Sequence, residues 1–252
     1  MLLLFFAIAF GFTWFFHVLL LRRYLPFDSP KGQLIYILGL PGPLIAALIL
    51  ASLTNVQGGL QGLLNGILQW RVGLIWWAMA LLPILAINLL ATSISVLRSG
   101  KSSEMIFHKP ANGWMWLVVS QIYVVFSEEV GWRGFALPQL IEQFGSLGAA
   151  LVLGMLWSLW HLAMFSIPDS NQTGSFWKYT IGVTTRSVLM TVIYTGSGGS
   201  ILLCMLFHAV TNVWFFTMTL PPDADRYTKI LSVLAALAVL PLLSHPRLLF
   251  DP

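Results

Sequence analysis

Residues 74–97 read LIWWAMALLPILAINLLATSISVL, a run that contains no charged side chain. About 20 mostly apolar residues are enough for a helix to cross the hydrocarbon core of a bilayer. The run therefore predicts a transmembrane helix, and it is bounded by polar or helix-breaking residues on its C-terminal side at Arg98-Ser99-Gly100.

The composition of the whole chain agrees with this reading. Of 252 residues, 58% are hydrophobic and 9% are charged, whereas an ordinary soluble protein carries roughly 25% charged residues. Disorder is excluded because it requires low hydrophobicity and high net charge. The net charge of +4 is spread thinly, without the Lys/Arg cluster that binds nucleic acid. Cys204 is the single cysteine, which excludes an internal disulfide and a cysteine-based metal cage.

Eight stretches are long and apolar enough to be membrane spans. They cover about residues 1–21, 32–54, 74–97, 113–133, 147–167, 179–196, 199–220 and 230–245. They lack the strict alternation of barrel strands, and backbone groups in lipid must be satisfied within each segment. The sequence therefore predicts an all-α, polytopic transmembrane helical bundle of about eight spans, in one membrane-embedded domain over residues 1–252. The first span is expected to be retained, because it has no basic n-region and no signal-peptide cleavage site.

The distribution of basic residues predicts the orientation of the chain. The odd-numbered loops hold Arg22, Arg23, Lys31, Arg98, Lys101, Lys109, Lys178, Arg226 and Lys229. The even-numbered loops and the tails hold Arg71 and Arg247. Because basic loops stay on the cytoplasmic side, we expect the odd-numbered loops in the cytoplasm and both termini outside.

Three further patterns concern the ends and the breaks of the predicted helices. Leucine and isoleucine recur at helical spacing over residues 57–69, which predicts either an interfacial amphipathic helix or a packed loop helix. Five tryptophans sit near span ends, where an aromatic belt is expected: Trp70, Trp76, Trp77, Trp114 and Trp116. Pro41-Gly42-Pro43 predicts a break in the second helix, which is tolerated where neighbouring helices or water satisfy the freed backbone groups.

The segment Ser127-Glu128-Glu129-Val130-Gly131-Trp132-Arg133-Gly134 places charges where lipid would exclude them. A charge at the bilayer centre costs about 2.5–3.5 kcal/mol on the mildest scale, so such residues usually mark function. Glu129 and Arg133 are four residues apart in the favourable order for an intrahelical ion pair. Adjacent residues on a helix point about 100° apart, so Glu128 is left on another face, free to act elsewhere. The alternative is that both carboxylates reach solvent at a helix end.

Three other sites break the apolar pattern. His161 lies inside the fifth span, where a satisfied core histidine is the simpler interpretation. His208 and Asn212 share one helix face, and interhelical hydrogen bonding would explain them. Arg186, in the sixth span, favours a structural ion pair or a contact with lipid phosphate. Cys204 has no thiolate motif around it and is expected to be a buried structural residue, and His17, His108 and His245 are interpreted as interfacial.

Taken together, a carboxylate, two imidazoles and an amide on apolar helices are the parts that hydrolysis requires. A carboxylate or histidine removes a proton from water, and polar donors stabilise the oxyanion that forms.

These residues resemble the motifs of the intramembrane CAAX-type prenyl-endopeptidase family, also called the CAAX protease and bacteriocin-processing (CPBP or Abi) family. The resemblance consists of Glu128-Glu129-x-x-x-Arg133, then Trp157-x-x-x-His161, then His208-x-x-x-Asn212, in this order on apolar helices. The run from Glu128 to Pro138 is similar to the prokaryotic members, so we expect a prokaryotic cell membrane. Trp157 stands where the second motif often has Phe, which preserves an aromatic wall.

The resemblance implies peptide-bond hydrolysis within the membrane. Glu128 and His161 would activate the attacking water, and His208 and Asn212 would support the oxyanion or hold the water. Glu129, Arg133 and Trp157 would organise the site. We expect no metal cofactor; Zn²⁺ held by Glu128, His161 and His208 is the alternative. The expected partners are membrane lipid and a peptide or prenylated protein substrate, and no nucleic acid.

Two other classes of function compete with this interpretation. A transporter or proton-relay protein would also use membrane-embedded Glu and His, but the first half of the chain has no counterpart of the polar cluster, which a repeat-built carrier would have. A catalytically silent scaffold or immunity-type protein is the third reading. Rhomboid and aspartyl intramembrane proteases are disfavoured, since the chain has no Gly-x-Ser-Gly and every Asp is expected in a loop or tail.

The predicted spans contain one conflict. Glu128 lies late in the fourth span and His161 late in the fifth, which puts them on opposite sides of the membrane. The two residues should be level if they share a water molecule. We therefore expect the fourth helix to run further, to about Phe144, which would move Glu128 toward the middle of the membrane.

Overall fold

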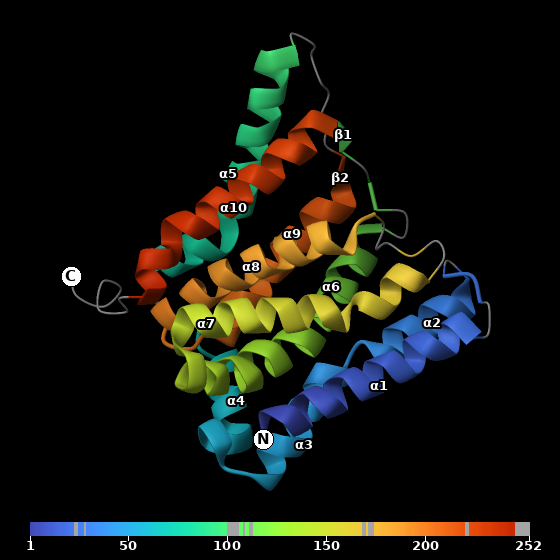
Figure 1. Cartoon of the computed structure of the whole chain (residues 1–252), viewed down its shortest axis with the longest axis vertical. Helices are drawn as coiled ribbons and strands as arrows, with labels where there is room; N and C mark the ends of the chain where they lie inside the picture. Colours follow the sequence, from blue (N-terminus) through green and yellow to red (C-terminus); the bar gives the residue numbers. More distant parts are fainter. Residues whose placement is uncertain are drawn as a thin grey trace.

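A computed structural model describes residues 1–22, 25–27, 29–99, 106–107, 109–110, 113–167, 170, 174–219 and 222–244. The predicted features at Arg23, Lys101, His108, His245 and Arg247 lie outside these residues. In the described part, helices form a bundle, confirming the predicted all-α polytopic fold (Figure 1). The α-helices are α1 (Leu2–Arg22), α2 (Pro30–Gly39), α3 (Gly42–Leu53), α4 (Gly59–Ile67), α5 (Leu74–Ser99), α6 (Gly113–Glu129), α7 (Leu137–Trp160), α8 (Phe176–Gly196), α9 (Ile201–Thr217) and α10 (Pro222–Ser244).

Short elements link these helices. Two are 3₁₀ turns, η1 (Val56–Gly58) and η3 (Leu162–Ser166), and η2 (Val130–Ala136) is a π-helix that joins α6 to α7. A feature that the sequence did not indicate is a two-stranded antiparallel pairing of β1 (Ile106–Phe107) with β2 (Met218–Thr219), in the register Ile106 to Thr219.

Apolar stretches long enough to cross a membrane agree with most of the predicted spans. Among the described residues they are Leu2–Arg22, Pro30–Leu53, Leu74–Arg98, Gly113–Ser166 and Arg226–Leu243, and Ile201–Thr217 is a shorter apolar helix. The chain is therefore an integral membrane protein. The sixth predicted span is the helix α8, whose Lys178 and Arg186 make it more polar than the others.

The fourth helix does run beyond the predicted boundary at residue 133. α6, η2 and the first part of α7 are continuous up to Gly145, whose φ of 66° and ψ of 171° break the helix. The expectation that this helix reaches Phe144 is therefore confirmed. Glu128 then lies near the middle of a helical segment that begins at Gly113, and the conflict between the depths of Glu128 and His161 is removed.

The break that Pro41-Gly42-Pro43 predicts is also present, between α2 and α3. The hydroxyl of Thr13 on α1 donates a hydrogen bond to the carbonyl oxygen of Gly39 over 2.7 Å, which satisfies a backbone group at the break. The broken segment lies close to η2: a methyl group on Gly131 would stand 2.5 Å from the backbone of Pro43. α3 and η2 are therefore packed so closely that Gly131 cannot carry a larger side chain unless the backbone of Pro43 moves.

The segment predicted at residues 57–69 has features of both of its interpretations. Leu63 of α4 is buried and lies next to Gly134 of η2, as in a packed loop helix. Leu60 and Leu64 are about half exposed, as in a helix lying at a membrane interface. Of the predicted belt residues, Trp70, Trp114 and Trp116 are exposed, whereas Trp76 packs its ring on Gly196 of α8 and belongs to the helix packing.

We expect Gly131→Ala to destabilise the protein. The added methyl group would collide with the backbone of Pro43, and overpacking of this kind costs about 1–3 kcal/mol. The matched control is Gly182→Ala on α8, where an added methyl group meets no atom within 4 Å and where alanine favours the helix. Thermal unfolding of the purified protein in detergent should give a lower Tm for Gly131→Ala and an unchanged or higher Tm for Gly182→Ala. Equal Tm values for the two variants would contradict the close packing of α3 on η2.

Candidate active site

A buried carboxylate, Glu129, holds three helical segments together. Its Oε2 lies 2.9 Å from Nη1 of Arg133 in η2, so the ion pair predicted from the spacing is confirmed. Its Oε1 accepts a hydrogen bond from Nδ1 of His208 on α9 over 2.7 Å. Glu129 and Arg133 are both fully buried. In such surroundings a charge is tolerated only when it is paired and hydrogen-bonded, so Glu129 fixes η2 and α9 relative to α6.

The neighbouring carboxylate, Glu128, points to a different partner. Its Oε2 accepts a hydrogen bond from the indole Nε1–H of Trp157 on α7 over 2.6 Å, and only 3% of the residue is exposed. The adjacent Glu residues therefore diverge as the helical spacing predicts: Glu129 binds Arg133 of η2 and His208 of α9, and Glu128 faces α7.

Trp157 also contacts Arg133, His208 and His161. The guanidinium carbon of Arg133 lies 4.4 Å from the centre of the indole ring, a distance that favours cation–π attraction. The ring of His208 meets the indole edge to face at 5.2 Å. The backbone carbonyl oxygen of Trp157 lies 2.9 Å from Nδ1 of His161. Trp157 therefore links the two groups: its indole N–H binds Glu128, and its backbone carbonyl binds His161.

His161 follows directly after the last residue of α7 and caps that helix. A carbonyl oxygen can only accept, so the contact with Trp157 requires the proton of a neutral imidazole to be on Nδ1. Nε2 is then an unprotonated acceptor. The ring packs against Trp160 at 4.7 Å and against Tyr179 of α8 at 5.4 Å. These aromatic walls and the hydrogen bond fix the ring with its basic nitrogen available.

Asn212 lies one turn beyond His208 on α9 and is half-buried. Its amide group makes no hydrogen bond with another residue in the part of the chain that the structure describes. The amide of Asn212 and the remaining nitrogen of His208 are therefore two polar groups one turn apart on a single helix, as predicted from their spacing.

The candidate residues fall into two hydrogen-bonded groups, and Asn212 is bonded to neither of them. Glu128, Trp157 and His161 form one hydrogen-bonded chain, and Arg133, Glu129 and His208 form a second. Trp157 joins the two through its ring. Asn212 is attached to this arrangement only through its position on α9.

The zinc alternative requires Glu128, His161 and His208 to converge on one metal ion. Among the described residues, no three His, Cys, Asp or Glu side chains are grouped so that they could hold a metal ion. Glu128, His161 and His208 are hydrogen-bonded to three different groups instead. The residues present therefore do not fit the zinc site of the alternative interpretation.

Two predictions about histidine and cysteine can be compared with the structure. The interpretation of His17 as interfacial is wrong: only 1% of the residue is exposed, and its ring stacks on Tyr36 of α2 at 5.7 Å. Its place late in the first span resembled a span end, because the sequence does not show that α2 covers this part of α1. Cys204 is buried, and its thiol donates to the carbonyl of Met190, as expected of a structural cysteine.

Tyr179 is a residue of the site that sequence reasoning missed. It contacts both His161 and Phe165, and it lies on α8, which packs along α7. A tyrosine near the start of a span looks like a member of an aromatic belt, so nothing in the sequence separates it from an interfacial anchor.

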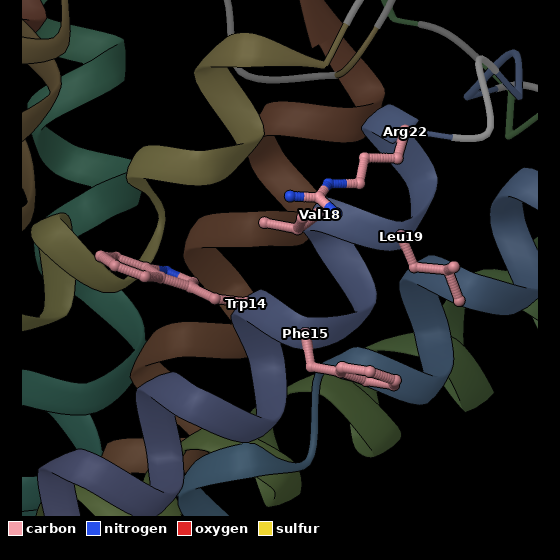
Figure 2. Close-up of a pocket in the computed structure, with 5 residues that line it drawn as sticks. All are labelled: Trp14, Phe15, Val18, Leu19 and Arg22. Atoms are coloured by element: carbon pink, nitrogen blue, oxygen red, sulfur yellow. The ribbon is translucent and has the colours of Figure 1, made fainter.

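A surface depression of about 410 Å³ lies on α1, away from these groups. Trp14, Val18 and the side chain of Arg22 lie along one side of the helix, and Phe15 and Leu19 point away from them (Figure 2). None of the candidate catalytic residues lines it. Trp14 nevertheless reaches the end of α7, because its indole N–H donates to the carbonyl of Trp160 over 2.9 Å.

Comparison with known proteins covers the part of the chain that contains these residues. A family model described as type II CAAX prenyl endopeptidase, Rce1-like, matches residues 110–214, which include every candidate catalytic residue. A curated relative, CAAX prenyl protease 2 of Methanococcus maripaludis, is 24% identical over 236 residues and covers 86% of each chain.

The helical fold, the ordered motifs and these matches define an intramembrane peptidase with a peptide or protein substrate. Residues 110–214 are thus similar to the Rce1-like type II CAAX prenyl endopeptidases, and most of the chain is similar to an archaeal CAAX prenyl protease 2.

We expect Glu129→Gln to lower the stability of the folded protein markedly. The substitution removes the only carboxylate bound to Arg133 and His208 among the described residues, and breaking a buried ion pair costs about 3–5 kcal/mol. The control is Glu142→Gln, the same change at an exposed residue of α7 whose carboxylate accepts a hydrogen bond from Gln57. Thermal unfolding in detergent should show a large loss in Tm for Glu129→Gln and almost none for Glu142→Gln. A Tm for Glu129→Gln close to that of the control would contradict the structural role of Glu129.

Proposed function

We propose that this protein hydrolyses a peptide bond close to the C-terminus of a prenylated protein or peptide, within a prokaryotic cell membrane. Water activated by Glu128 and His161 would be the nucleophile, without a metal. The observation that carries the proposal is the double contact of Trp157, whose indole N–H binds Glu128 and whose carbonyl binds His161. One residue thus holds two proton acceptors at a single turn of α7.

The attack step follows from the acceptors that remain available. The Glu128 carboxylate has one oxygen that is not bonded to Trp157, and His161 has an unprotonated Nε2. Water between these groups gives a proton to one of them while its oxygen forms a bond to the carbonyl carbon of the substrate. When the tetrahedral intermediate collapses, the C–N bond breaks and the same proton passes to the leaving amine.

The oxyanion requires donors in a site from which bulk water is largely excluded. Asn212 offers an amide N–H, and His208 offers its Nε2 when the ring is protonated. A protonated ring at His208 would be neutralised by Glu129, whose carboxylate already accepts the Nδ1 hydrogen bond. In this proposal Glu129, Arg133 and Trp157 are positioning residues that hold the catalytic groups in place.

The substrate class rests on the comparisons rather than on geometry. Both the matched family and the relative are described by their action on CAAX prenyl proteins, and a CAAX box is a C-terminal tetrapeptide whose cysteine is prenylated. A lipid-modified substrate also suits an active site on membrane helices, because the prenyl chain would keep the peptide at the bilayer.

The whole chain is proposed to act as a single membrane-embedded domain, residues 1–252. Support comes from one apolar core that takes residues from α1, α3, η2, α7, α8 and α9, from Phe5 to Phe207. Removing the helices before α6 would therefore expose apolar core side chains of the segment that carries the catalytic residues.

The central test is Glu128→Gln, with His161→Ala as a second variant. Glutamine keeps an oxygen that can accept the Trp157 hydrogen bond but cannot accept a proton from water, so we expect a loss of activity of at least about 100-fold with little change in Tm. Cleavage is measured on purified protein with peptides that carry or lack a prenyl group at the fourth residue from the C-terminus, and the prenylated peptides should be cut faster.

The matched control for this test is Glu142→Gln, which should cleave at the wild-type rate. Full cleavage by both Glu128→Gln and His161→Ala would refute the proposed mechanism. Ion or solute transport by the wild-type protein without proteolysis would support a carrier instead.

A second prediction concerns the metal. Since Glu128, His161 and His208 are not grouped as metal ligands, we expect cleavage to persist after exhaustive treatment with a chelator, at a rate within about twofold of the untreated enzyme. The measurement is the initial rate before and after chelation, and again after adding Zn²⁺. Activity that disappears and returns only with Zn²⁺ would show that the metal-free proposal is wrong.

A further inference from the structure

Arg186 is a cation in the middle of α8 that the proposed mechanism does not use. It lies seven residues after Tyr179 and between Val183 and Met190, a spacing that places all four on one face of the helix. Val183 and Met190 are fully buried in the main core, and Tyr179 contacts His161. This face of α8 is therefore directed toward the interior, on the side of the candidate active site.

Among the residues that the structure describes, Arg186 has no bonded partner. No described residue forms an ion pair or a hydrogen bond with it, whereas Arg133 is bonded to Glu129 at 2.9 Å. It is close enough to Glu128, Tyr179 and His161 to interact with them electrostatically. It is also not fully buried, since its exposure is intermediate. An accessible, unpaired cation beside the catalytic groups is suited to bind an anionic part of a ligand.

The spacing along α8 indicates which anion. Seven residues of helix rise by about 10 Å, so Arg186 is displaced by about that length from Tyr179, which packs on His161. Three residues of extended peptide also span about 10 Å. A carbonyl group beside His161 would therefore place a carboxylate three residues further along the chain near Arg186. A CAAX box has three residues after its prenylated cysteine.

We propose that Arg186 binds the C-terminal carboxylate of the substrate and so sets how far from the end the peptide is cut. The inference rests on the proposed function, because it assumes that the bond after the prenylated cysteine is placed beside Glu128 and His161. A guanidinium suits this task, since it presents two parallel N–H donors to a carboxylate.

The test compares prenylated peptides that end in a free carboxylate with the same peptides ending in an amide. Wild-type enzyme should prefer the acid, with a kcat/KM higher by about 10- to 100-fold, as expected for a hydrogen-bonded charge pair. Arg186→Met should reduce kcat/KM for the acid to the value for the amide and leave the amide value within about twofold. Arg186→Lys should keep part of the preference.

Two controls make this result specific to Arg186. Arg71→Met removes an arginine that lies over the ring of Trp70 on the surface, and it should keep the full preference for the acid. Arg186→Met should leave Tm unchanged or raise it, because no partner is lost and a charge is removed from a membrane helix.

Binding is measured as well, on protein that carries Glu128→Gln, with fluorescently labelled acid and amide peptides. This binding measurement separates the two proposals. If the acid binds more tightly than the amide in a way that depends on Arg186, but the wild-type enzyme cuts no peptide, the carboxylate site is supported and the proposed function is refuted. Equal binding and cleavage of acid and amide would overturn the inference. Two results for Arg186→Met would also overturn the inference. One is an equal loss of activity on both peptides, which is expected if Arg186 binds lipid phosphate or the oxyanion. The other is a fall in Tm as large as that of Glu129→Gln.

Discussion

The carboxylate of Glu129 is the interaction on which the rest of the site depends. It is fully buried, and it holds an arginine of η2 and a histidine of α9 at hydrogen-bonding distance. Inside an apolar bundle the attraction between such groups is strong, and an unpaired charge is costly. The three segments must therefore adopt the one arrangement in which the groups meet. That arrangement fixes Arg133 over the ring of Trp157, and the same indole donates to Glu128. A structural ion pair and a candidate catalytic carboxylate are thus adjacent in sequence but serve different helices.

The backbone departs from a regular α-helix where neighbouring segments pack closely or where the chain turns back. η2 is a π-helix, an element that is rare in proteins overall but common at functional sites. It directly follows the two carboxylates. Gly131 allows the break at Pro41-Gly42-Pro43 to approach η2, and Thr13 satisfies a carbonyl at that break. Gly145 ends the long helical segment that starts at Gly113 and lets the chain turn back, which brings Trp157 and His161 level with Glu128. Each departure from a regular helix therefore has a neighbour that requires it.

Most of the fold could be predicted from the sequence, because lipid imposes a simple rule on length and polarity. The same rule identifies misplaced charges, and the four-residue spacing predicts the Glu129–Arg133 pair. What could not be predicted depends on contacts between helices. The hydrogen bond from Trp157 to Glu128, the contact of Tyr179 with His161 and the burial of His17 under α2 all depend on which helix faces which, and periodicity within one helix does not contain that information. The boundary at residue 133 was wrong for a related reason: a polar segment looks like the end of a span, but here its charges are neutralised inside the bundle.

The charges of the interior also constrain how a substrate would fit. Two carboxylates, Glu128 and Glu129, and two guanidinium groups, Arg133 and Arg186, interact within this part of the bundle. On our proposals, a substrate that ends in a carboxylate adds one negative charge beside Arg186. His208 is held by Glu129 through Nδ1, and a ring that carries both protons has an N–H on Nε2 to donate to the oxyanion. Binding of the chain end at Arg186 would also hold the reacting carbonyl in place beside Glu128 and His161, which favours the chemical step. An amide-terminated peptide would supply no such charge, and its disadvantage would appear in the chemical step as well as in binding.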